Sequence, residues 1–191
     1  MEWNELIEES AWVVQELLTR DECNYMLKQA NDLDILKQTS SGDKRHRNSV
    51  TVAFDDEDLA NKLHERIKDY IPQQVWVDKD CTNMGLRASK EQLYGRWTPH
   101  SINHRWRVAC YPGQGHFGPH RDRCRIINEH CRSLITINGF LTDRPSGFGG
   151  ATRFVKDDII AKVNEDGIYS TKECDVLHRV EAEHAGTASV L

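Results

Sequence analysis

Hydrophobic positions near the start of the chain recur first as a run and then with a helical period. Residues 11–17 are mostly apolar and predict a strand. Thr19 and Glu22 follow with the spacing of a capping box, in which a hydroxyl and a carboxylate each accept a hydrogen bond from a backbone N–H at the start of a helix. The next apolar positions share one helical face: Cys23, Met26, Leu27 and Ala30. A strand followed by a helix is therefore expected here.

A second helical stripe follows Asp55 and Asp56. Its apolar members are Leu59, Leu63, Ile67, Tyr70 and Ile71. Proline lacks the N–H that a helix interior needs, so Pro72 is expected to end this helix.

From about residue 105 the period changes to two. Trp106, Val108 and Cys110 alternate with their neighbours, which predicts a strand, and residues 111–115 have the composition of a turn. Four further segments are strand candidates: 133–141, 151–155, 174–181 and 187–191. Helices followed by strands favour an α+β fold, with helices packed on a β-sandwich or jelly roll.

The composition narrows the class of protein. A chain of 191 residues with 38% hydrophobic residues fits one globular domain. Its formal net charge of −5 disfavours nucleic acid as a partner. No apolar run approaches the ~20 residues of a membrane span, and the first residues are acidic where a secretory signal is basic. We therefore expect an intracellular, cytoplasmic protein with no membrane partner.

Histidine, cysteine and aspartate supply the candidate chemistry. In an extended backbone, His120 and Asp122 point to the same side and Arg121 to the other. An imidazole and a carboxylate on one face are two of the three ligands in the 2-His-1-carboxylate set that binds non-haem Fe(II). A zinc site that includes Cys124 and Cys131 is the alternative, although no pair has zinc-finger spacing. The six cysteines are otherwise expected to be free thiols.

The segments around His120 resemble the prolyl 4-hydroxylase superfamily of Fe(II)/2-oxoglutarate dioxygenases. The similar strings are V-A-C-Y-P-G at 108–113, S-L-I-T-I-N-G-F-L-T-D at 133–143 and F-G-G-A-T-R-F at 148–154. The A-C-Y-P-G string is similar to the hypoxia-inducible-factor prolyl hydroxylases. Residues 16–23 and 47–49 also look like superfamily elements, so the resemblance covers most of the chain.

The resemblance implies a fold and an activity. The fold is α+β, one domain over 1–191, with N-terminal helical support over about 1–80 and a double-stranded β-helix (jelly-roll) core over about 100–191 whose last strands are missing. The activity is hydroxylation of a prolyl residue in a protein or peptide, with O2 consumed and succinate and CO2 formed. The cofactors are Fe(II), 2-oxoglutarate as co-substrate, and ascorbate.

The resemblance also implies site residues. His120 and Asp122 would bind the metal, Tyr111 would hydrogen-bond 2-oxoglutarate, and Thr136 would line the 2-oxoglutarate-binding pocket. Phe117 would line the pocket, and Gly149-Gly150 would form a tight turn. From the residues alone, Tyr111 and Phe117 also fit a hydrophobic core, and Thr136 fits ordinary strand packing.

Two positions depart from the superfamily pattern. Phe140 stands where many members have a tyrosine, and the strand-like segment 186–191 ends the chain where a distal histidine ligand and a basic residue would follow. His178 and His184 precede that segment, so we expect an exposed strand position for His178 and a turn for His184, with a substitute-ligand role for either as the alternative. Truncation, an impaired chain and an uncovered strand edge are the expectations that follow.

Three other functions stay open from the sequence. The same scaffold serves nucleic-acid demethylases and small-molecule hydroxylases. The basic stretch 121–125 is compatible with a nucleic-acid or small-molecule substrate. A non-enzymatic binding domain would retain the fold without a complete metal site. A zinc module is the third.

Overall fold

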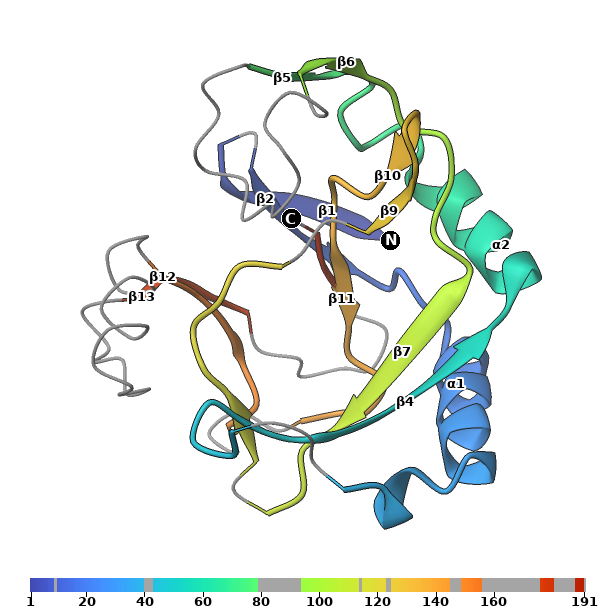
Figure 1. Ribbon diagram of the computed structural model, residues 1–191, viewed down its shortest axis with the longest axis vertical. Helices are drawn as coiled ribbons and strands as arrows, with labels where there is room; N and C mark the ends of the chain where they lie inside the picture. Colours follow the sequence, from blue (N-terminus) through green and yellow to red (C-terminus); the bar gives the residue numbers. More distant parts are fainter. Residues whose placement is uncertain are drawn as a thin grey trace. The chain divides into compact units, whose positions relative to one another are not determined.

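The computed structural model describes residues 1–8, 10–39, 43–78, 94–113, 115–122, 125–144, 149–155, 176–180 and 188–190 (Figure 1). These residues form a mixed α+β arrangement of helices and small antiparallel sheets, so the predicted α+β class is confirmed. The jelly-roll arrangement of the strands remains a prediction. No helix in the described ranges is both long enough and apolar enough to cross a lipid bilayer.

The chain divides into two compact units, each built from separate stretches of sequence. The first comprises Met1–Asp55, Arg105–His120 and Ile137–Leu191, and the second comprises Asp56–His104 and Arg121–Thr136. The chain therefore passes between the units at four points. The single-domain prediction therefore requires the two units to unfold together.

A four-stranded antiparallel sheet belongs to the first unit. Its strand order is β1 (Glu2–Ile7), β2 (Ala11–Gln15), β14 (Ala188–Val190) and β11 (Ile137–Gly139). Val14 is fully buried opposite Ala188. The prediction that the last strand has an uncovered edge is wrong, because β14 lies between β2 and β11 and both of its edges are hydrogen-bonded.

Helix α1 (Arg20–Asp32) starts as its sequence predicts. The Glu22 backbone N donates to Thr19 Oγ1 at 3.2 Å, and the Thr19 backbone N donates to Glu22 Oε2 at 2.9 Å. Cys23, Met26 and Ala30 are buried and Leu27 is partly buried, so the predicted face is confirmed. The helix contacts β4 (Val50–Asp55) and β7 (Arg105–Cys110).

Replacing Thr19 with alanine is expected to lower the free energy of unfolding by about 1 kcal/mol, because one N–H at the helix start loses its acceptor. Urea denaturation followed by far-UV circular dichroism measures the change. Thr142→Ala, at an exposed loop position, is the matched control and should change stability by less than about 0.5 kcal/mol. Equal effects of the two substitutions would contradict the role of the box.

Strands β4 and β7 form the longest strand pair of the first unit and lie side by side in Figure 1. Their register runs from Val50 opposite Cys110 to Asp55 opposite Arg105. Burial in β7 alternates as predicted, with Val108 buried between the exposed Arg107 and Ala109. The Asp55 and Arg105 side chains form an ion pair at 3.0 Å, so the segment 56–104 leaves and rejoins the first unit at one paired position.

Short elements complete the first unit. The 3-10 helix η1 spans Ile35–Lys37, β3 (Arg47–Asn48) pairs with β8 (His116–Phe117), and β12 (Thr152–Val155) pairs with β13 (Val176–Val180). The turn predicted at 111–115 is confirmed by the hydrogen bond from Gly115 N to Pro112 O at 3.0 Å. Gly149 and Gly150 have φ of +76° and +84° before β12, a backbone conformation that favours glycine.

The second unit carries helix α2 (Glu57–Ile67), which Asp56 caps by accepting from the Leu59 backbone N at 2.9 Å. Leu59, Leu63 and Ile67 are buried as predicted. The helix ends at Ile67, so the prediction that Pro72 ends it is wrong. The Tyr70 backbone N donates to the Ile67 carbonyl oxygen at 2.9 Å, which closes a turn before the proline and leaves the Tyr70 side chain exposed.

Two hairpin-like pairs accompany α2. They are β5 (Val75–Val77) with β6 (Gly95–Trp97), and β9 (Ile126–Asn128) with β10 (Cys131–Arg132). The predicted strand 133–141 is reduced to Ile137–Gly139. Ser133 explains part of this, because its backbone N donates to Arg125 O at 2.9 Å and its Oγ accepts from Arg125 N at 2.8 Å. These bonds extend the β9–β10 hairpin and leave residues 134–136 outside any strand.

Candidate metal site

The pairing of β3 with β8 brings residues near 46 beside residues near 118. Arg47 lies opposite Phe117 and Asn48 opposite His116. The Gly118 backbone N donates to the His46 carbonyl oxygen at 2.7 Å, which continues the ladder by one residue. The approach is close: a Cβ on Gly115 would lie 2.7 Å from Asn48 O, so a side chain there would force the strands apart.

His120 is held by its own loop. Its Nδ1 lies 2.8 Å from the Gly118 carbonyl oxygen. A carbonyl oxygen only accepts, so Nδ1 carries the proton and, in the neutral ring, Nε2 carries the lone pair. Metal-binding histidines commonly have this arrangement, in which a backbone carbonyl fixes the tautomer and the ring orientation.

Phe117 forms an apolar support under the His120 ring. The two rings are stacked, with centroids 3.7 Å apart and planes 18° apart. The Arg47 guanidinium lies over the same phenyl ring at 4.4 Å from its centroid. Phe117 therefore contacts the candidate ligand directly, as expected for a residue that lines a metal pocket.

His46 is a neighbour that sequence reasoning missed. Its ring meets Phe117 edge-on at 5.4 Å and His120 edge-on at 6.3 Å between centroids. Burial lowers the pKa of His46, and the neighbouring charge of protonated His120 lowers that pKa further. Both effects favour the neutral imidazole, which is the form that binds metals. Only the register between β3 and β8, which no local motif reveals, places this residue here.

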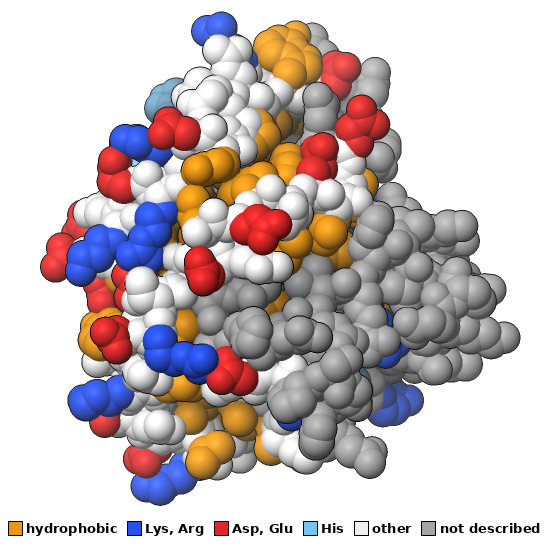
Figure 2. All heavy atoms as spheres, turned by 180° about the vertical axis from the view of Figure 1, so that it is seen from behind, with side chains coloured by type: hydrophobic (Ala, Val, Ile, Leu, Met, Phe, Trp, Pro, Cys, Tyr) orange, Lys and Arg blue, Asp and Glu red, His pale blue; other side chains and the backbone are white. Residues whose placement is uncertain are grey.

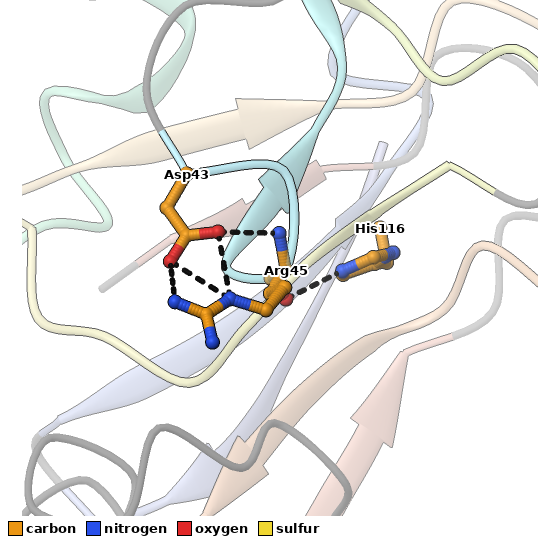
Figure 3. Close-up of polar contacts among 3 residues, drawn as sticks. All are labelled: Asp43, Arg45 and His116. Atoms are coloured by element: carbon orange, nitrogen blue, oxygen red, sulfur yellow. Dashed lines mark hydrogen bonds and ion pairs between the residues drawn. The ribbon is translucent and has the colours of Figure 1, made fainter.

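The loop before β3 is fixed by charged and backbone contacts (Figure 3). Arg45 forms an ion pair with Asp43 at 2.8 Å, and hydrogen bonds from Arg45 lower the pKa of the Asp43 carboxyl. The Arg45 carbonyl oxygen accepts from His116 Nε2 at 2.9 Å. The hydrogen bond from His116 on β8 thus anchors the loop that contains His46.

The other predicted site residues are divided between the two units. Tyr111 directly follows β7 in the first unit and is 39% exposed. Asp122 is exposed and Thr136 is partly buried, and both belong to the second unit. Neither unit by itself therefore brings His120 and Asp122 together. Along the chain, exposure alternates from His120 to the half-buried Arg121 to Asp122, as an extended H-x-D segment requires.

Other metal ligands were considered among the described residues. These residues contain no group of three or more His, Cys, Asp and Glu side chains that could hold an ion. Cys131 is a free, half-buried thiol on β10. Cys124 and His184 lie outside the described residues, and for His178 the structure describes only the backbone, opposite Phe154 in the β12–β13 pair. The zinc alternative and the His184 alternative therefore both stay predictions.

The distribution of charge bears on the class of partner. On the face shown in Figure 2, Lys and Arg side chains lie among Asp and Glu side chains, with apolar side chains between them, and no described part of this face is a basic patch. Such a surface offers no extended electrostatic footprint for a phosphate backbone.

No protein-family model, curated protein or solved structure matches the chain.

Proposed function

We propose that the protein is an Fe(II)- and 2-oxoglutarate-dependent dioxygenase that hydroxylates a prolyl residue in a protein or peptide. One observation carries the proposal. In the H-x-D segment, the His120 Nδ1 proton is donated to Gly118 O, which leaves the lone pair on Nε2. A histidine held in this way, two residues before a carboxylate, supplies two ligands of the non-haem iron set.

The residues around His120 fit such a group. The imidazole stacks on Phe117, so an apolar ring covers one face of the candidate ligand. Asp122 is exposed, so its carboxylate is accessible to an ion from solvent. Both donor types suit a first-row divalent metal, and the open positions that they leave suit a bidentate co-substrate and oxygen.

Each residue then has a defined task. His120 and Asp122 would hold the ion, Tyr111 would donate a hydrogen bond to 2-oxoglutarate, and Thr136 would line the co-substrate pocket. When bound, the iron activates O2 so that 2-oxoglutarate is converted to succinate and CO2 while the substrate gains a hydroxyl group. Ascorbate would keep the iron reduced.

The fold that we propose for this chemistry is a single double-stranded β-helix (jelly-roll) domain in an intracellular, cytoplasmic protein. Antiparallel pairs such as β4–β7, β3–β8 and β12–β13 are the elements from which such a core is made. The formal net charge of −5 supports a protein or peptide substrate over nucleic acid.

An anaerobic titration tests the function. Fe(II) and 2-oxoglutarate are added to the protein, and the visible charge-transfer band of the chelated co-substrate is recorded. The band is expected in the wild type and absent in His120→Ala, because the imidazole ligand is lost. His100→Ala, at an exposed histidine outside the cluster, is the matched control and should keep the band.

The same titration distinguishes the proposed dioxygenase from its main rival. The rival is a binding domain without enzymatic activity, which would retain the fold without a complete metal site. Such a domain would give no band in the wild type, and that outcome would overturn the proposed function.

A further inference from the structure

The β5–β6 strand pair of the second unit carries a large aromatic side chain on its outward face (Figure 1). Alternation along β5 explains this exposure: Val77 is buried, whereas Trp76 lies on the opposite face and is 61% exposed. Trp76 pairs with Arg96 on β6, and directly opposite residues of an antiparallel pair share one face. The Arg96 side chain is exposed as well, so an indole and a guanidinium lie side by side on this face.

Tyr94, the residue before β6, adds a second ring. It meets the Trp76 ring edge-on, with centroids 5.5 Å apart and planes 77° apart, and it is 45% exposed. The two rings therefore present apolar planes at nearly right angles to each other. The side chains of Trp76, Tyr94 and Arg96 are called the Trp76 surface below.

The two tryptophans of this strand pair differ in their partners. Trp97, opposite Val75, lies under the Arg132 guanidinium, which is 5.1 Å from its ring centroid. Among the described residues, only Tyr94 is in ring contact with Trp76, and none accepts a hydrogen bond from the Trp76 indole N–H. Arg96 likewise forms no ion pair within the described part of the chain. One aromatic N–H donor and one cation are thus open to a ligand from solvent.

The chemistry of the Trp76 surface matches that of a proline-rich peptide. Such a peptide adopts the polyproline II conformation, which has no internal hydrogen bonds, so its carbonyl oxygens are free to accept. Aromatic side chains bind these segments by packing against the proline rings. Trp76 and Tyr94 supply the rings, and the Trp76 indole N–H supplies a donor for a carbonyl oxygen. The positive charge of Arg96 complements an acidic residue in the same peptide.

The size and charge of the Trp76 surface disfavour other occupants. A stable protein–protein interface takes roughly 20–30 residues from each partner, far more than the three side chains of this surface. A second copy of the chain or a large globular partner therefore fits it poorly. The formal net charge of −5 disfavours a nucleic acid. A short peptide can bind through a few aromatic and arginine anchors.

We propose that the Trp76 surface binds an acidic, proline-rich segment of the polypeptide substrate. The inference rests on the proposed function, because a prolyl hydroxylase acts on a chain that contains proline. It assigns part of substrate selection to side chains other than those that would hold the metal and 2-oxoglutarate.

Fluorescence anisotropy measures this binding without iron, 2-oxoglutarate or oxygen. The probes are a fluorescein-labelled decaproline flanked by glutamates, the same peptide flanked by lysines, and a glycine-serine peptide flanked by glutamates. The wild type should bind the first probe most tightly. Trp76→Ala should weaken that binding at least about 10-fold, as expected of an aromatic hot spot. Arg96→Gln should remove the preference for glutamates over lysines.

Tyr25→Ala, at an exposed tyrosine of the first unit, is the matched control and should bind like the wild type. Far-UV circular dichroism checks that each variant is folded. Equal affinity of the wild type for the proline and glycine-serine peptides would overturn the inference, as would an affinity that Trp76→Ala leaves unchanged. Binding of a single-stranded oligonucleotide, or self-association in sedimentation velocity, would also overturn it if either depended on Trp76 and the proline peptide did not bind.

The iron titration is a separate readout. A charge-transfer band in a protein that binds no proline peptide would overturn the role of the Trp76 surface and leave the proposed function standing. The lack of a band in a protein that binds the peptide through Trp76 would overturn the proposed function and leave a peptide-binding surface.

Discussion

Asp122→Ala is expected to lower Fe(II)-dependent formation of succinate from 2-oxoglutarate at least about 1000-fold, equivalent to about 4 kcal/mol in the activation barrier. The reason is that the carboxylate is the anionic ligand of the proposed site. Without it, the ion loses both a bond and the charge that balances it. Succinate is measured by chromatography, at saturating Fe(II) and 2-oxoglutarate and with ascorbate present.

The neighbouring arginine provides the control. Exposure alternates along His120, Arg121 and Asp122, so the Arg121 side chain is expected on the side away from the two ligands. Arg121→Gln should change the succinate rate by no more than a few-fold. An equal loss of succinate formation in both variants would show that the activity depends on the conformation of the loop and not on the Asp122 carboxylate. Asp122 would then be removed from the site.

Local sequence signals predicted the parts of the fold that depend on neighbouring residues. The Thr19–Glu22 box and the apolar stripes of α1 and α2 involve positions three or four residues apart, and the structure confirms them. Strand β1 was missed because acidic residues interrupt its alternation, as is common for strands at a sheet edge. Strands of two or three residues, such as β8 and β10, are too short to show a period.

Local sequence patterns could not predict features that depend on strand pairing. The sequence singled out His120, because H-x-D is a local motif, but not His46, whose place depends on the register of β3 against β8. The same limit explains the error about β14. Its strand character was evident from the segment 186–191, whereas its two partners, β2 and β11, come from distant parts of the chain.

Leu63→Ala is expected to lower the free energy of unfolding by about 2–5 kcal/mol, because the substitution leaves a cavity under α2. Leu63 is 2% exposed. Leu17→Ala in the first unit should cost a similar amount, since Leu17 is 1% exposed. Lys62→Ala, at the exposed position next to Leu63, is the matched control and should stay within about 0.5 kcal/mol of wild type. Urea unfolding followed by tryptophan fluorescence and by far-UV circular dichroism measures all three.

The pair of leucines also tests whether the chain is one domain. The chain passes between the units at four points, and the ion pair between Asp55 and Arg105 closes one of the inserted segments at its base. Neither unit can therefore lose its fold without releasing the ends of segments that belong to the other. We expect one transition, seen alike by both probes and moved to lower urea by either leucine substitution. Two transitions, one shifted only by Leu17→Ala and the other only by Leu63→Ala, would show that the units fold independently and that the single-domain prediction is wrong.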